Sequence, residues 1–311
     1  MKKLVLIGIL LILSVCVYLT TQTPSSEQDR KVNFSNFFKN MGKGVQSVAR
    51  STTKMLPLTD DDEKKIGEEL SSFYRRTNQG DKKTKNYLNE LLKEFSPYLR
   101  KKFKYEINLD SCACSNAYAL PGGIVFVTEG ILDTFKTESE LISVIAHEIA
   151  HVELNHCIDA VKYEALSEKI FKSSVGKLAD LSRRLFISHS FSQSQEDEAD
   201  TYAFEFLKRS KYDPMGVANA FANLMNSSGT STSNKSSPIR DYFRSHPPLE
   251  DRVKKFSALA KQWWKKNSSM KRYLGHENLK KRVTLSQRDF GKKEYRTGPI
   301  KSSEQPNFFT K

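Results

Sequence analysis

The 311-residue sequence has few cysteines and only one long apolar run. Four cysteines are too few for a fold that depends on disulfide bonds. The single run, Leu4–Leu19, excludes a membrane protein with several spanning helices. One residue separates Cys112 from Cys114, a spacing at which a disulfide is strained and uncommon, so we expect ordinary thiols there. The chain has no internal repeat.

The first 21 residues have the layout of an export signal or an N-terminal membrane anchor. Lys2 and Lys3 precede the apolar run, and a polar stretch follows Leu19. No small-x-small cleavage site follows Leu19, and Cys16 lies in a lipobox-like context, so an uncleaved anchor and a lipid-modified cysteine are both alternatives. Because the lysines stay on the cytoplasmic side, we expect the rest of the chain to reach the cell envelope or periplasm, with residues 22–57 as a linker.

The formal charge of +14 is concentrated near the C-terminus, where eleven lysines and arginines lie between positions 265 and 296. We interpret residues 267–311 as a basic, solvated and partly disordered tail. Contact of this tail with anionic lipid or cell-wall polymer is the alternative. Nucleic acid is not an expected partner, because we expect the chain to be exported. The sequence leaves the oligomeric state undetermined.

Hydrophobic periodicity predicts a mainly helical α+β domain over residues 58–266. We expect helices at about 58–78, 84–95, 160–186, 195–209, 214–225 and 249–264, and strands at about 104–109 and 123–128. A further helix begins at Thr137, because Thr137 and Glu140 have the spacing of a capping box. Apolar residues lie on most faces of this helix, so we expect it to be central and buried.

Three polar residues, His147, Glu148 and His151, lie within this predicted buried helix. Polar side chains are unfavourable there unless something offsets their desolvation, and metal coordination does so. Two histidines four residues apart project from one helical face, so both imidazoles reach one zinc ion. Glu148 is then the general base, which takes a proton from the attacking water and returns it to the leaving amine. His156 lies further round the helix, where we expect a supporting or structural position.

A catalytic zinc site needs a third protein ligand and an open position for water. In the helix predicted at 195–209, Glu196 shares an apolar face with Asp200, whereas Glu198 lies on a polar face. We therefore choose Glu196 over Glu198 as the third ligand. Asp200, one turn later, is expected to accept a hydrogen bond from a ligating histidine.

Four segments in this order resemble the M48 family of zinc metallopeptidases: Asn116–Gly123, His147–His151, Glu196–Asp200 and Ser245–Arg252. The resemblance implies a zincin-type domain, with a small sheet beside the active-site helix and one zinc ion per chain. It also implies a substrate-binding strand that includes Asn116, Ala117, Gly122 and Gly123. By the same resemblance, His246 assists catalysis or acts as a gate near the metal, and Arg252 holds the His246 segment in place.

The predicted function is that of a zinc-dependent endopeptidase. The resemblance links this activity to quality control of misfolded or misassembled envelope proteins, with unfolded or misassembled proteins as substrates and a membrane contact through the N-terminal segment. Two alternatives stay open. One is a chaperone-like assembly factor with a latent metal site, and the other is a non-peptidase zinc hydrolase that acts on the cell envelope.

Overall fold

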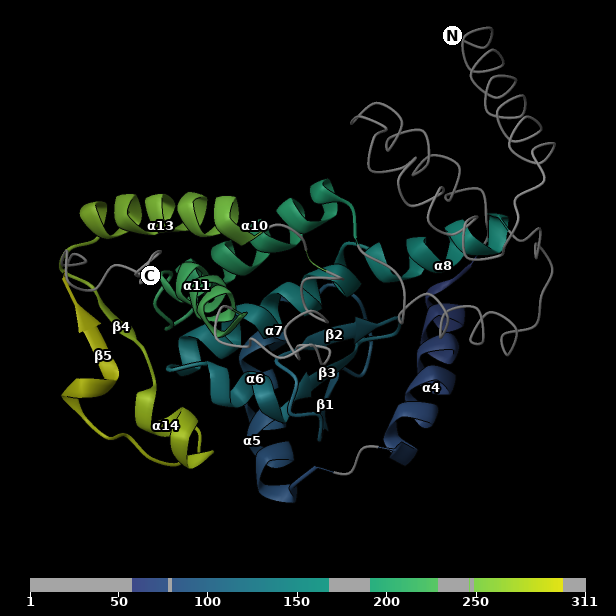
Figure 1. The fold of residues 1–311 in the computed structure, drawn as a ribbon, viewed down its shortest axis with the longest axis horizontal. Coiled ribbons are helices and arrows are strands. Elements are labelled where there is room, and N and C mark those ends of the chain that lie inside the picture. Colours follow the sequence, from purple (N-terminus) through teal and green to yellow (C-terminus); the bar gives the residue numbers. More distant parts are fainter. Residues whose placement is uncertain (1–57, 78–79, 168–190, 229–245, 247–248, 299–311) are drawn as a thin grey trace, which may run out of the picture. The chain divides into compact units, whose positions relative to one another are not determined.

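The computed structural model describes residues 58–77, 80–167, 191–228, 246 and 249–298, which all belong to one compact unit within residues 50–311 (Figure 1). The N-terminal apolar run, the linker and Cys16 lie outside the described residues. Among the residues that are described, no helix is both long enough and apolar enough to cross a membrane. The fold is mainly helical with a small sheet, as predicted.

The N-terminal half of the unit combines helices with the sheet, in the order α4 (Asp60–Thr77), α5 (Lys82–Leu92), η1 (Lys93–Tyr98), β1 (Glu106–Asp110), β2 (Ala117–Leu120), β3 (Ile124–Thr128), α6 (Glu129–Thr134) and α7 (Glu138–Glu153). The C-terminal half contains α8 (His156–Ser167), α10 (Gln193–Arg209), α11 (Gly216–Ser228), α13 (Leu249–Lys266), β4 (Lys271–Tyr273), α14 (His276–Lys281), η2 (Lys292–Glu294) and β5 (Tyr295–Thr297). The predicted helix at 160–186 begins earlier, at His156, and its second half lies outside the described residues.

The small sheet has the strand order β1-β3-β2, so β3 is central and β2 forms an edge. β3 pairs in parallel with β1 and antiparallel with β2, and all five β3 residues are buried. The turn between β2 and β3 needs glycine, because Gly122 has a φ of 81° and Gly123 a φ of 89°. Helix α4 covers this turn so closely that a Cβ atom on Gly67 would lie 1.9 Å from the Pro121 carbonyl oxygen.

Helix α7 is central, as the sequence predicted, and every residue from Glu138 to Val152 is buried. The Thr137 hydroxyl accepts a hydrogen bond from the Glu140 backbone N–H at 3.2 Å, which is one half of the expected capping box. The other half differs, because the Glu140 carboxylate accepts from the Lys136 N–H and from the Asn223 side chain instead. Glu140 therefore links the start of α7 to α11.

The cysteine expectation was wrong, because Cys112 and Cys114 form a disulfide in the loop between β1 and β2. The surrounding backbone holds this loop against the sheet. The Gly130 N–H donates to the Cys112 carbonyl, and the Thr128 hydroxyl donates to the Cys114 carbonyl. These contacts come from the last residue of β3 and from α6, so local spacing carried no sign of them.

Residues 267–298, the C-terminal segment, are folded, whereas the sequence analysis interpreted residues 267–311 as a solvated and partly disordered tail; residues 299–311 lie outside the described residues. Strands β4 and β5 pair antiparallel, and Tyr273 and Leu279 are buried. The segment also binds the start of α7, since the Glu138 and Ser139 N–H groups donate to the carbonyls of Gly275 and Leu274 at 3.1 and 3.0 Å. The first N–H groups of a helix have no partner within that helix, so these carbonyls satisfy donors that would otherwise be buried unpaired.

A buried carboxylate lies at the same end of α7. Glu138 accepts hydrogen bonds from the hydroxyls of Tyr87 at 2.8 Å and Tyr212 at 2.9 Å, and its side chain is fully buried. Burial raises the Glu138 pKa to about 7, although both tyrosine hydrogen bonds and the charge of Lys211 act in the opposite direction. Glu138 thus links α5, α7 and the segment that follows α10. Above neutral pH its carboxylate is charged in a buried position, which destabilises the fold.

This effect of the buried charge predicts a pH-dependent stability. The Glu138 pKa is about 7 in the folded chain and near its ordinary value of 4.5 when unfolded, so its contribution is fully present below pH 4.5 and lost as the pH rises through 7. The loss amounts to at most about 3 kcal/mol. We expect Glu138→Gln to remove this part of the pH dependence, measured as the difference in urea unfolding free energy between pH 5 and pH 8.

Glu68→Gln is the matched control, because Glu68 is an exposed glutamate on α4. This control should keep the wild-type difference between the two pH values. An unchanged pH dependence in Glu138→Gln would show that Glu138 does not titrate in this window.

Candidate metal centre

Four buried side chains converge between α7 and α10: His147, His151, Glu196 and His246, whose donor atoms all lie within 4.8 Å of one another. The two α7 histidines lie one helical turn apart, so their Nε2 atoms are only 3.0 Å apart. Glu196 lies in the first turn of α10, the helix that α7 contacts most extensively. The exposed fraction of these four side chains is at most 2%.

The distances between donor atoms match a single small cation. Ligand atoms about 2.0–2.1 Å from a tetrahedral zinc ion lie roughly 3.3–3.4 Å from one another. Here the Glu196 oxygens lie 3.4 Å from His147 Nε2 and 3.5 Å from His151 Nε2. His246 Nδ1 lies 3.2 Å from His147 Nε2 and 2.8 Å from the Glu196 carboxylate. A set of imidazole nitrogens with one carboxylate oxygen is a donor set that suits zinc.

Glu148 lies beside this cluster and is fully buried. Neither of its carboxylate oxygens has a hydrogen-bond partner among the described residues. The His246 ring approaches this carboxylate, with Nε2 at 3.5 Å from Oε1. A buried carboxylate normally accepts hydrogen bonds, so the two oxygens of Glu148 are available to accept them from a water molecule or a substrate.

The second ring nitrogen of His147 is held by Asp200. Its Nδ1 lies 2.9 Å from the Asp200 carboxylate, as expected for a partner that orients a ligating histidine. Arg252 binds the same carboxylate through two nitrogens, at 2.6 and 2.7 Å, and also lies 3.1 Å from Glu196. It donates to the His246 carbonyl at 3.4 Å. Arg252 therefore connects α13 to the donor cluster and to the His246 backbone.

The position of His156 differs from the helical geometry assumed in the sequence analysis. The chain turns at Leu154 and at Asn155, whose φ is 65°, so His156 begins a new helix. This turn brings His156 Nδ1 to 3.0 Å from His151 Nδ1, while its other nitrogen lies 3.2 Å from the Glu198 carboxylate. Glu198 thus acts on the cluster through His156, a role that the sequence did not suggest.

Phe191 is a further residue that the sequence analysis missed. Its ring stacks on His151 with centroids 3.8 Å apart and an interplanar angle of 19°. The ring also lies near His246, with centroids 5.9 Å apart. No spacing rule links Phe191 to the histidines, because it lies just before α10 and reaches α7 only in the folded chain.

Charges in the cluster shift one another's pKa values. Burial opposes protonation of His147, but the Glu196 charge and the Asp200 hydrogen bond outweigh it and raise the His147 pKa to about 9. Burial and the charge on His147 lower the His151 pKa well below its ordinary value. Burial also disfavours the Glu196 carboxylate, but His246 and His147 hold its pKa well below the usual range. A cation and a proton therefore compete for the same donor atoms.

The predicted substrate strand corresponds to the edge strand β2 and the turn after it. Ala117 is in β2 and pairs with Val127 of β3, while Asn116 precedes the strand and donates its N–H to the Thr128 hydroxyl. Strand β2 packs against α7. On β2, the Ala119 carbonyl is contacted by the Cys157 thiol at 3.7 Å.

Comparison with known proteins gives one family. Residues 79–260 match the model of peptidase family M48. Metalloprotease LoiP of Escherichia coli is 33% identical over 35% of this chain and 47% of its own length. The mitochondrial metalloendopeptidase OMA1 of Arabidopsis thaliana is 27% identical over 45% of this chain and 28% of its own. The beta-barrel assembly-enhancing protease of Yersinia pestis is 31% identical over 40% of this chain and 28% of its own length.

The matched part of the chain thus spans about half or less of the length of these relatives. LoiP is named a metalloprotease and OMA1 a metalloendopeptidase, and peptidases of this family use zinc, so the family agrees with the predicted peptidase class and metal. Since the family model covers more than half of the sequence, the chain belongs to peptidase family M48.

Proposed function

We propose that this protein is a zinc-dependent endopeptidase that removes misfolded or misassembled proteins from the cell envelope. The observation that carries the chemical part is the donor cluster with zinc-like spacing beside a buried glutamate that accepts no hydrogen bond from the described residues. The proposed location rests on the N-terminal apolar run, and the proposed substrates rest on the relative named for beta-barrel assembly.

In this proposal His147, His151 and Glu196 are the zinc ligands, and Asp200 keeps His147 in its ligating orientation. Zinc supplies Lewis acidity toward a water molecule and toward the scissile carbonyl. Glu148 takes a proton from the attacking water and donates it to the nitrogen of the leaving amine. Burial raises the Glu148 pKa, which favours a carboxylate that readily accepts and holds this proton.

His246 fills the fourth donor position in the described conformation. A catalytic zinc site keeps one position for water, whereas four protein donors make a closed site. Because His246 Nδ1 lies against both His147 and Glu196, the ring must move before water and substrate enter. We therefore assign His246 the role of a gate, held by Arg252 through its carbonyl. The enzyme is then latent until this ring moves.

Strand β2 is proposed to bind the substrate, because an extended peptide adds to a sheet edge through main-chain hydrogen bonds. Ala117 and the carbonyl of Ala119 lie on this edge strand, and the glycine turn Gly122–Gly123 ends it. The Cys157 thiol is only a weak donor to Ala119, so a peptide N–H is the stronger partner for that carbonyl.

The burial of the site also favours a second candidate, a chaperone-like assembly factor with a latent metal centre. The two functions differ in one assay. The purified full chain, in detergent, is mixed with an unfolded envelope protein with and without a zinc chelator. Chelator-sensitive cleavage supports the endopeptidase, whereas stable binding without cleavage by wild type and by gate variants supports the assembly factor.

The assignment of Glu196 as the third zinc ligand predicts that replacing it weakens zinc binding. Glu196→Ala removes one donor of the cluster, so we expect zinc affinity to fall by more than the roughly 10–100-fold that residues supporting a ligand contribute. Zinc per chain after dialysis against a weak chelator measures this. Asp197→Ala is the matched control, because Asp197 is an exposed acid on the same helix, and this variant should keep its zinc. Full zinc occupancy in Glu196→Ala would remove Glu196 from the ligand set.

The general base is tested with an isosteric change. Glu148→Gln keeps the shape of the side chain but cannot accept a proton, so we expect cleavage to fall by roughly 10²–10⁴-fold with zinc still bound. Fluorogenic peptide hydrolysis and metal analysis on the same preparation separate the two effects. Cleavage at the wild-type rate would exclude Glu148 as the base.

The proposed role of His246 as a gate predicts that removing its ring raises the rate of cleavage. His246→Ala opens the fourth position, so we expect basal cleavage to rise about tenfold or more if the open form is a minor state of roughly 0.1–10% in the wild type. The three remaining ligands should keep zinc bound. A fall in kcat with zinc retained would instead identify His246 as a group that assists the reaction.

A further inference from the structure

The folded C-terminal segment carries an excess of positive charge. Between residues 265 and 297 the sequence has eleven lysines and arginines against three acids, Glu277, Asp289 and Glu294. All of this stretch lies beyond residues 79–260, the part that matches the family model. The charge is therefore an addition to the peptidase domain, and it stands on a folded scaffold.

Three of the eleven basic residues hold the scaffold together. Arg296 forms an ion pair with the buried Asp213 at 2.6 Å. Arg272 donates to the carbonyls of Ser210 and Lys208. Arg282 donates to the Leu279 carbonyl and lies 3.7 Å from Asp133. The contacts of these three arginines account for their positions, and Arg288 lies over the Phe290 ring; the other seven basic residues are lysines.

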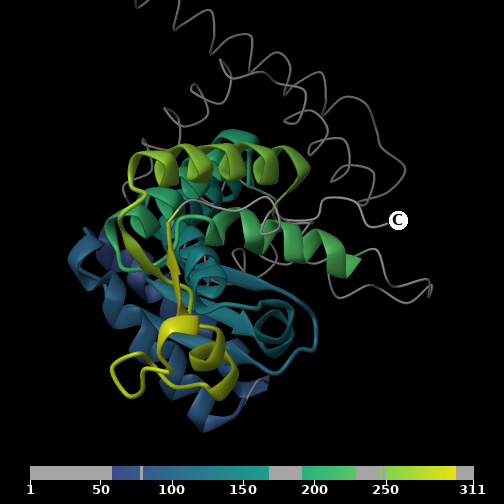
Figure 2. The same ribbon diagram turned by 90° about the vertical axis from the view of Figure 1, so that its left-hand side faces the viewer.

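Seven lysines of the segment are exposed and form no ion pair with any described residue, and together we call them the basic face. They are Lys265, Lys266 and Lys271 around the start of β4, and Lys280, Lys281, Lys292 and Lys293 on α14 and η2. Figure 2 shows this segment, in yellow, on the side of the unit that faces the viewer.

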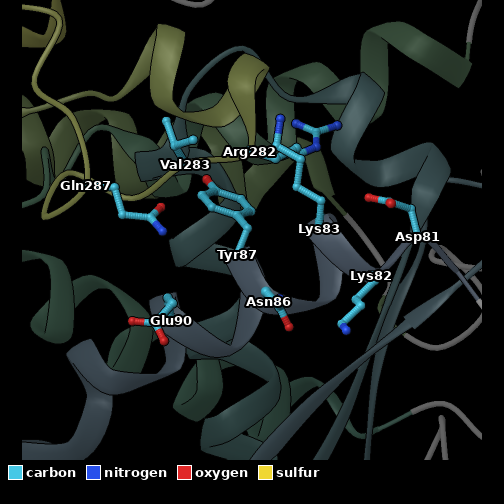
Figure 3. A pocket seen from close by; sticks show the side chains of 9 residues that line it. All are labelled: Asp81, Lys82, Lys83, Asn86, Tyr87, Glu90, Arg282, Val283 and Gln287. Atoms are coloured by element: carbon cyan, nitrogen blue, oxygen red, sulfur yellow. The ribbon is translucent and has the colours of Figure 1, made fainter.

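The three acids of the segment form no ion pair with the basic face, and its seven lysines outnumber them. Glu294 is buried and accepts from the Glu277 N–H, and Asp289 accepts from the Gly291 N–H and the Tyr295 hydroxyl. Lys82 and Lys83 of α5 add positive charge nearby, since they line an open pocket together with Arg282 (Figure 3). Two acids of that pocket have partners, because Asp81 caps α5 and Glu90 binds Lys93.

The composition of the basic face favours a lipid surface over a nucleic acid. Lysine is a point charge that suits a diffuse anionic surface, whereas precise phosphate recognition uses the arginine fork. The large hydrophobic side chains exposed among the described residues are Met270 and Leu259, and neither is an aromatic ring on which bases stack. Met270 lies between Lys266 and Lys271 and is 43% exposed, a combination typical of groups that enter a bilayer interface.

The sequence supplies a reason to expect a bilayer near the basic face. The N-terminal apolar run is expected to associate with the membrane, and residues 22–57 are expected to link it to the domain. Two contacts within one chain raise the effective concentration of each for the other, so even a weak contact between domain and lipid is favoured. We propose that the basic face docks the peptidase domain on the anionic lipid headgroups of the membrane.

This docking restrains the orientation of the active site. A contact between the basic face and lipid fixes one side of the domain against the bilayer. The C-terminal segment is bonded to the first residues of α7 through the carbonyls of Leu274 and Gly275, so lipid contact and the metal-binding helix are coupled through rigid structure. Docking does not depend on the peptidase reaction.

Lysine footprinting of the full chain tests the proposal. The protein is placed in nanodiscs of neutral phosphatidylcholine, or of phosphatidylcholine with about 30% phosphatidylglycerol, and the rate of lysine acetylation is measured by mass spectrometry. We expect the basic face to react at least about threefold more slowly in the anionic discs, and salt of about 0.5 M to abolish the difference. Lys64, Lys65, Lys102 and Lys104 are exposed lysines elsewhere on the unit, and their rates should not change.

Equal rates in both discs would overturn the proposal, and so would equal slowing at the control lysines, because that indicates unspecific attraction. A third arm adds double-stranded DNA to the neutral discs. Protection by DNA without protection by anionic lipid would assign the face to nucleic acid and overturn the lipid contact.

A pair of variants with the same change in charge sharpens the test. Lys280, Lys281, Lys292 and Lys293 are all replaced by Gln in one variant, and Lys64, Lys65, Lys102 and Lys104 in the other. We expect the first variant to lose most of the protection at Lys265, Lys266 and Lys271, and the second to keep it. Full protection in the first variant would overturn a role for the α14 end of the face.

Discussion

The desolvation of charged side chains on the buried helix α7 is the constraint on which the rest of the structure depends. His147, Glu148 and His151 lie where apolar residues would normally pack, and their burial is tolerated only because opposite charges and a metal site surround them. Helices α10 and α13 supply these charges. Asp200 of α10 forms an ion pair with Arg252 of α13 and also contacts His147 of α7, so the packing of these three helices fixes the orientation of His147.

Both ends of α7 are held by segments distant in sequence. At its start, carbonyls of the C-terminal segment accept from Glu138 and Ser139, and two tyrosines bind the Glu138 carboxylate. At its end, the turn at Asn155 returns the chain so that His156 contacts His151. A helix restrained in this way is a rigid base for metal ligands. Opening of the site is therefore assigned to His246, which belongs to neither α7 nor α10.

Much of the site could be predicted from the sequence, because it depends on helical periodicity. The four-residue spacing of the histidines and the common face of Glu196 and Asp200 are local properties of single helices. Other features could not be predicted in this way. The Cys112–Cys114 bond, the contact of Phe191 with His151 and the link from Glu198 through His156 all depend on which segments meet after folding.

The sequence by itself determined the identity of the donor atoms, the helix that presents two of them and the class of chemistry, because these follow from residue type and short-range geometry. Only the tertiary structure decided that a fourth donor, His246, completes the cluster and that the basic C-terminal segment folds against α7. Both features depend on contacts between residues far apart along the chain. His246 meets His147 and Glu196 only in the folded chain, and the basic segment has no apolar period that predicts a fold.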